Sequence, residues 1–120
     1  MYVFVYGTLK QGFHNHQHLE NAEFICEATT KDKYPMVNIE EYFPYLINDK
    51  GVGNNVHGEV YKIDTSILTF LDILEGYPEL YIREKIKVAS IGVELSVIVY
   101  FVKEKIDYKN LSLLENFELN

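Results

Sequence analysis

The sequence has few of the residues that build disulfides or nucleic-acid grooves. It contains one cysteine, Cys26, no tryptophan, and 11 Lys and Arg residues against 18 Asp and Glu, for a formal net charge of −7. Cys26 has no partner for an internal disulfide, which is typical of a reducing compartment, and we expect it to fill a small apolar space. Because no cluster of Lys or Arg could neutralise phosphates, we expect no nucleic-acid partner.

Long apolar runs are missing as well. No stretch approaches the ~18 apolar residues typical of a membrane-spanning helix. The chain begins directly with a strand-like segment, not with a basic region followed by an apolar leader. We therefore expect a cytoplasmic protein with no membrane partner, and a monomer by default. With 120 residues and a hydrophobic share of 48%, residues 1–120 are expected to form one domain with its own core.

Apolar patterning predicts a set of short strands and one helix. Strands are expected over residues 2–6, 23–31, 57–63, 81–89 and 93–102, with short extended pieces over 34–37 and 42–47. Residues 48–55 are dense in turn formers and predict a loop, and 14–22 predict a loop or a short helix. The tail from Lys103 is expected to pack loosely.

The one predicted helix follows Asp64 or Thr65, which can cap it, and ends near Glu75, before Gly76 and Pro78. Because only this segment could serve as a helical crossover between parallel strands, most strand pairs should be antiparallel. The sequence therefore predicts an α+β domain built on a closed or half-open barrel.

Glu75 is the residue of that helix with most chemical interest. An apolar stripe is expected to contain Ile67, Phe70, Leu71 and Leu74, with Glu75 at its flank and Asp72 further round toward solvent. Apolar surroundings and the negative end of the helix dipole would both raise the pKa of Glu75 toward neutrality. Such a carboxyl can accept a proton and return it. The competing interpretation is that Glu75 points outward as an ordinary helix former.

The loop after the first strand offers a complementary feature. Residues 6–9, Tyr-Gly-Thr-Leu, can present consecutive backbone N–H groups that bind a carboxylate or a developing oxyanion. The spacing of a phosphate-binding loop is absent. A plain turn is the competing interpretation of Gly7 and Thr8.

Three histidines at positions 14, 16 and 18 raise the question of a metal site. No cysteine accompanies them, and the nearest acidic residue is Glu20. A solvated polar loop is the favoured interpretation, and we predict no metal ligands.

In combination, three segments of the chain resemble the gamma-glutamylcyclotransferase-like family, and within it the gamma-glutamylamine cyclotransferase branch. They are VFVYGTLKQG from residue 3, GEVY at 58–61 and LDILEGYPELY at 71–81. The likeness runs in order from residue 2 to about residue 102 and includes the pairs at 15–16 and 34–35 and VYF at 99–101.

The resemblance implies a small mixed, mostly antiparallel β-barrel with flanking helices and a pocket at one end. Glu75 matches the catalytic carboxylate of the family. The resemblance further implies that the substrate-binding residues are Tyr6, Gly7, Thr8, Leu9, Tyr81 and Tyr100.

The implied activity is the conversion of a γ-glutamyl amine or γ-glutamyl peptide to 5-oxoproline and a free amine. The substrate's own α-amino group attacks its γ-carbonyl, so no cofactor is expected. Two other functions stay open at this point. One is a non-catalytic protein whose pocket binds a small acidic metabolite, and the other is hydrolysis of a γ-glutamyl amide to glutamate.

Overall fold

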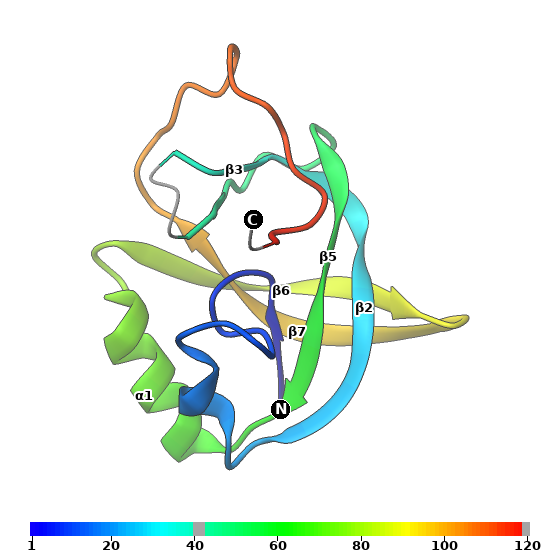
Figure 1. The fold of residues 1–120 in the computed structure, drawn as a ribbon, viewed down its shortest axis with the longest axis vertical. Coiled ribbons are helices and arrows are strands. Elements are labelled where there is room, and N and C mark those ends of the chain that lie inside the picture. The colour runs from blue at the N-terminus through cyan, green and yellow to red at the C-terminus, as the bar shows by residue number, and fades with distance from the viewer. Residues whose placement is uncertain (40–42, 119–120) are drawn as a thin grey trace.

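A computed structural model describes residues 1–39 and 43–118, so residue 42 of the expected extended piece lies outside the described residues (Figure 1). Five strands close into a barrel in the order β1-β5-β2-β6-β7, and a separate pair, β3-β4, packs beside it. Their bounds are β1 Tyr2–Val5, β2 Glu23–Tyr34, β3 Met36–Val37, β4 Tyr45–Leu46, β5 Asn54–Lys62, β6 Tyr81–Ser90 and β7 Val93–Val102.

The barrel is mixed because one of its strand pairs is parallel. β1 pairs antiparallel with β5 along its whole length, and closes the barrel by pairing parallel with β7 at Val3 and Ile98. β2 pairs antiparallel with both β5 and β6, and β6 with β7. The predicted α+β fold on a mostly antiparallel barrel is therefore confirmed.

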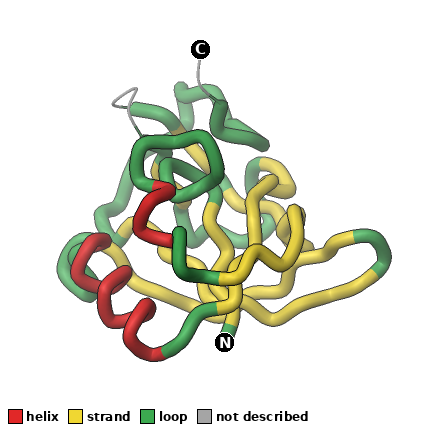
Figure 2. Tube along the Cα trace, turned by 60° about the horizontal axis from the view of Figure 1, so that its bottom comes forward, coloured by secondary structure: helices red, strands yellow, loops and turns green. Residues whose placement is uncertain are grey.

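Two helical elements flank the barrel on one side. They are η1, a 3₁₀ turn over His16–Leu19, and the α-helix α1 over Thr65–Glu75. The β6–β7 hairpin reaches away from the body on the side opposite α1 (Figures 1 and 2). No helix of residues 1–39 and 43–118 is long and apolar enough to cross a membrane.

Both ends of α1 are fixed by the local sequence. The side chain of Asp64 accepts a hydrogen bond from the Ile67 amide at 2.9 Å, which caps the first turn as predicted. At the other end Gly76 has a φ of 67°, and the amides of Gly76 and Tyr77 donate to the carbonyls of Ile73 and Asp72. This pair of bonds is the Schellman motif, in which glycine is favoured because of its positive φ.

The inward face of α1 differs from the predicted stripe. Leu68, Leu71, Asp72 and Glu75, spaced i, i+3, i+4, i+7, are all buried or half-buried, whereas Phe70 is 46% exposed. Phe70 packs its ring against His18 of η1 instead of entering the core. The expectation that Asp72 faces solvent was wrong, because its carboxylate bonds to side chains of β6 and β7.

The C-terminal tail crosses the end of the molecule that carries β3 and β4 (Figure 1), and it packs more closely than predicted. Phe117 is buried in the core. The Lys10 ammonium donates to Asn116 Oδ1 and to the Phe117 carbonyl, and the Leu114 amide donates to the Met36 carbonyl. The apolar residues of the tail follow no helix or strand period, so its close packing could not be predicted. The polar contacts join it to distant segments, which the local sequence does not indicate.

Gly58→Ala tests the packing of β1 on β5. A Cβ at Gly58 would lie 2.4 Å from the Val5 carbonyl oxygen and 2.5 Å from Phe4 Cζ, so the neighbouring strand would have to move. We expect the free energy of unfolding to fall by about 3 kcal/mol, the upper end of overpacking costs.

Gly92→Ala in the hairpin turn is the control. A Cβ there meets open space, so only the positive φ of 77° is unfavourable, at about 1 kcal/mol. Urea denaturation measures both variants. Equal losses would contradict the close approach at Gly58.

Candidate active site

One cavity of about 280 Å³ brings together the loop after β1, the end of α1, and residues of β6 and β7. Its volume is close to the lower end of ligand-binding pockets. All seven residues that the resemblance implied line this cavity, namely Tyr6, Gly7, Thr8, Leu9, Glu75, Tyr81 and Tyr100. Their roles remain predictions.

The loop at residues 7–9 keeps its carbonyls bound and its amides available. The Gly7 carbonyl accepts from the Lys10 amide at 3.0 Å, and the Thr8 carbonyl accepts from the Asn15 amide at 3.1 Å. The Leu9 carbonyl contacts His16 Nδ1 at 2.9 Å. Within the described part of the chain, the amides of these three loop residues donate no hydrogen bond to another residue. These three consecutive N–H groups therefore have no protein acceptor among the described residues, and all three residues line the cavity.

Gly7 is required by packing. A Cβ on Gly7 would lie 2.9 Å from Pro44 Cδ, which is closer than real Cβ contacts. Phe43 and Pro44, which come directly before β4, line the same cavity. The chain can pass this close to the loop only if residue 7 has no side chain.

Glu75 has the altered acidity that the sequence predicted. Burial raises its pKa from the ordinary value of 4.5 to about 7, because the charged form loses hydration in the cavity wall. A carboxyl with this pKa exchanges protons readily near neutral pH. Of the two interpretations left open by the sequence, the structure favours the inward-facing one.

Three tyrosines surround the carboxyl. The Tyr6 hydroxyl donates to the Tyr100 carbonyl at 2.6 Å, and burial, followed by the neighbouring Tyr81 and Glu75, raises the pKa of Tyr6 well above its usual range. Tyr81 stacks on Tyr45 with ring centroids 6.5 Å apart. The Tyr6 hydroxyl therefore stays neutral at physiological pH.

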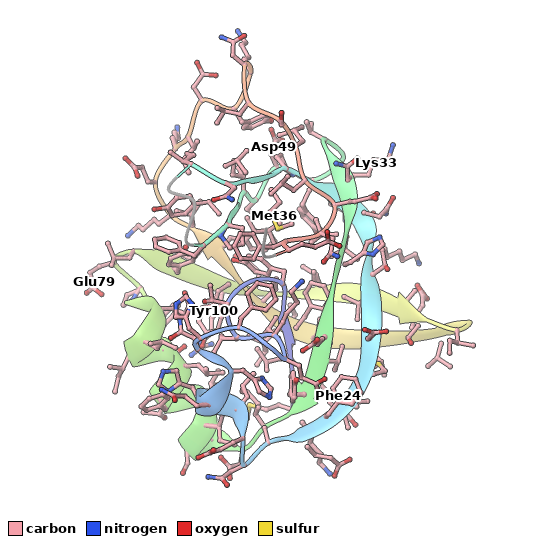
Figure 3. All side chains as sticks on the ribbon, viewed as in Figure 1. Phe24, Lys33, Met36, Asp49, Glu79 and Tyr100 are labelled. Carbon is pink, nitrogen blue, oxygen red and sulfur yellow. The ribbon has the colours of Figure 1, made fainter. Side chains whose placement is uncertain are left out.

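Tyr100 lies in the interior of the molecule, on the side that α1 covers (Figure 3). Its hydroxyl donates to Asp72 Oδ1 at 2.7 Å, and burial together with this bond raises its pKa. Glu79, four residues after Glu75, points outward in the same view. The exposed Glu79 cannot substitute for Glu75 in the cavity.

Two of the three histidines at positions 14, 16 and 18 have partners other than a metal. His16 bonds to the Leu9 carbonyl and packs on Tyr61, and His18 packs on Phe70. Among residues 1–39 and 43–118 no group of three His, Cys, Asp or Glu side chains could hold a metal ion.

Several cavity residues were missed by sequence reasoning: Phe4, Val5, Asn15, Phe43, Pro44, Leu74 and Leu80. Asn15 carried a usable signal, because an amide side chain soon after a Gly-Thr turn can bond back to it. Its Nδ2 donates to Thr8 Oγ1 at 3.0 Å. Phe43 and Pro44 reach the cavity only through the tertiary fold.

Comparison with known proteins identifies the family of the chain. A family model described as gamma-glutamyl cyclotransferase, AIG2-like, matches residues 3–118. The chain belongs to this family. The resemblance inferred from residues 3–12, 58–61 and 71–81 is thus confirmed.

Two curated relatives and one solved structure define the family likeness. Gamma-glutamylaminecyclotransferase A of Danio rerio is 50% identical over 91 residues, which cover 71% of this chain and 56% of the relative. A putative gamma-glutamylcyclotransferase of Methanocaldococcus jannaschii is 42% identical over 106 residues, covering 86% and 85%. The crystal structure of an AIG2-like protein from Mus musculus matches with a TM-score of 0.89 at 31% identity, covering 98% and 87%. The chain thus spans just over half of the zebrafish protein.

Glu75→Gln should change how stability depends on pH. The pKa of Glu75 in the folded state, about 7, exceeds its ordinary value of 4.5, so the folded state binds the extra proton between these pH values. The folded protein therefore loses stability as pH rises through this window, by roughly 3 kcal/mol at most. Glutamine mimics the neutral acid and has no such loss.

Urea denaturation of both proteins at pH 4.5 and pH 8 measures the difference. We expect the two to be similar at pH 4.5 and the variant to be the more stable at pH 8. A difference that does not change with pH would contradict a buried carboxyl.

Proposed function

We propose that this protein is a cyclotransferase that converts a γ-glutamyl amine or γ-glutamyl peptide to 5-oxoproline and a free amine. The observation that carries the proposal is the placement of Glu75, with its raised pKa of about 7, in the same cavity as the free amides of residues 7–9. The name of the zebrafish relative supports the same activity.

The two halves of the cavity have complementary tasks in this reaction. The amides of Gly7, Thr8 and Leu9 bind negatively charged oxygen, either the substrate carboxylate or the oxyanion that forms at the attacked carbonyl. Tyr81 and Tyr100 wall the cavity and exclude water. Glu75 handles the protons.

The chemistry begins with proton removal. Glu75 as carboxylate takes a proton from the substrate α-ammonium, and the freed amine attacks the γ-carbonyl carbon to form the new C–N bond. The proton on Glu75 then passes to the leaving nitrogen as the original amide C–N bond breaks. The second proton of the attacking nitrogen leaves with the departing amine, which is released as ammonium.

The intramolecular nucleophile explains the simple site. A five-membered ring closes between groups of one molecule, so orientation supplies much of the rate and no enzyme nucleophile is needed. The reaction involves no change of oxidation state. We therefore propose that it proceeds without a cofactor.

A substrate panel tests the proposed function. Purified protein is incubated with γ-glutamyl amines and γ-glutamyl peptides, and products are separated to distinguish 5-oxoproline from glutamate. Release of 5-oxoproline is the expected result. Free glutamate would indicate hydrolysis, and binding of 5-oxoproline without turnover of any substrate would indicate a metabolite-binding protein; either result overturns the proposal.

Glu75→Gln tests the assigned role. We expect kcat to fall by a factor of about 10² or more, the usual scale of general acid–base catalysis, while 5-oxoproline still binds. In the wild type, kcat/KM should rise with pH through the pKa of about 7 as Glu75 becomes the carboxylate. Unchanged turnover in the variant would remove Glu75 from the mechanism.

A further inference from the structure

An ion pair next to the cavity, Asp72 and Arg83, has no part in the mechanism above. Asp72 lies one turn before Glu75 on α1, and its carboxylate accepts three hydrogen bonds. Arg83 of β6 donates from Nε to Oδ1 at 2.9 Å and from Nη2 to Oδ2 at 3.2 Å, and Tyr100 of β7 donates to Oδ1 at 2.7 Å. We call Asp72, Arg83 and Tyr100 the clamp.

The ion pair in the clamp is better oriented and less exposed than an ordinary surface ion pair. The Arg83 contact is bidentate, which fixes the relative orientation of the two groups. The Arg83 guanidinium also lies over the Tyr77 ring, 4.5 Å from its centroid, and Tyr77 packs on the cluster that contains Leu71. The side chains of Arg83 and Asp72 are only 32% and 19% exposed.

The clamp joins three elements at the last turn of α1. Asp72 and Glu75 share the inward face of the helix at a spacing of i, i+3, so contacts that hold Asp72 also hold the turn of the helix that carries Glu75. The exposed positions Ile73 and Leu74 provide little packing to hold that turn. The apolar residues that anchor α1 on its inner side are Leu71 and, partly buried, Ile67 and Leu68.

We propose that Asp72, Arg83 and Tyr100 are positioning residues, which hold the last turn of α1 so that the Glu75 carboxyl stays inside the cavity. This inference rests on the proposed function for its effect on turnover. Its structural part, the burial of Glu75, stands independently. It also gives the Tyr100 hydroxyl a task other than contact with substrate.

The groups around Glu75 make its acidity a usable readout. Tyr6 from the loop after β1 and Tyr100 of β7 line the same cavity and carry no charge, and Tyr81 of β6 lines it as well. Asp72 is paired with Arg83, so the pair has no net charge. Burial is therefore the cause of the raised pKa of Glu75, and release of the turn into water should lower it.

Asp72→Ala is the main test. We expect the pKa of Glu75, followed by NMR titration of its side-chain carboxyl, to fall from about 7 toward 4.5. With an active substrate, kcat should fall about tenfold or more, whereas the affinity for 5-oxoproline should change less than about threefold. Asp72→Asn keeps one oxygen acceptor for the Tyr100 hydroxyl and should give intermediate values.

Two further variants separate position from charge and from general stability. In Asp72→Ala with Arg83→Met both charges are gone, so a fall in the pKa of Glu75 that remains there arises from hydration. Asp64→Ala weakens the start of the same helix by removing its cap and should leave both the pKa and kcat unchanged.

The outcomes are distinct. The proposal is overturned if the pKa of Glu75 stays near 7 both in Asp72→Ala and in the double variant with Arg83→Met. It is also overturned if Asp64→Ala loses as much kcat as Asp72→Ala does. Because the titration needs no turnover, it tests the clamp even if the substrate panel shows no 5-oxoproline. In that case the proposed function fails while the positioning role is decided by the pKa alone.

Discussion

The structure depends most on how the barrel accommodates two carboxylates on the inward face of α1. Burial of an ionised acid is unfavourable unless it is paired or neutralised. Asp72 is paired, through its bidentate contact with Arg83 and its bond from Tyr100. Glu75 responds differently, because burial raises its pKa to about 7 and the proton is held loosely. One face of α1 thus carries Asp72 as a paired carboxylate and Glu75 as a carboxyl that can gain or lose a proton near neutral pH.

The loop after β1 contributes hydrogen-bond donors to the cavity, in contrast to the two carboxylates of α1. Its carbonyls accept bonds from residues 10, 15 and 16, whereas its amides have no acceptor among the described residues. Pro44 packs against Gly7 and closes this side of the cavity. In the proposed reaction a preorganised donor set stabilises charge without reorganisation during the chemical step. The two features are separated by about seventy residues in sequence, and the barrel brings them together.

Much of the barrel could be predicted because strands such as Tyr81–Ser90 alternate clearly and because Asp64 and Gly76 mark the ends of α1. Glu75 and residues 6–9 were also predicted as candidate site residues. Glu75 is an acid at the unfavourable C-terminal end of a helix, and residues 6–9 match the family motif. The inward position of Asp72 was missed, because periodicity places apolar residues inward and gives no sign of a partner such as Arg83. Phe43, Pro44 and the tail contacts of Lys10 depend on tertiary packing between distant segments, which local patterns do not encode.

The central claim is that the amides of Gly7, Thr8 and Leu9 and the carboxyl of Glu75 act on one bound molecule. A crystal structure with 5-oxoproline tests it most directly. The account predicts the ligand in the cavity, with an oxygen about 3 Å from at least one loop amide and the lactam nitrogen about 3 Å from Glu75. A ligand bound elsewhere, or Glu75 turned into solvent with the ligand in place, would contradict it.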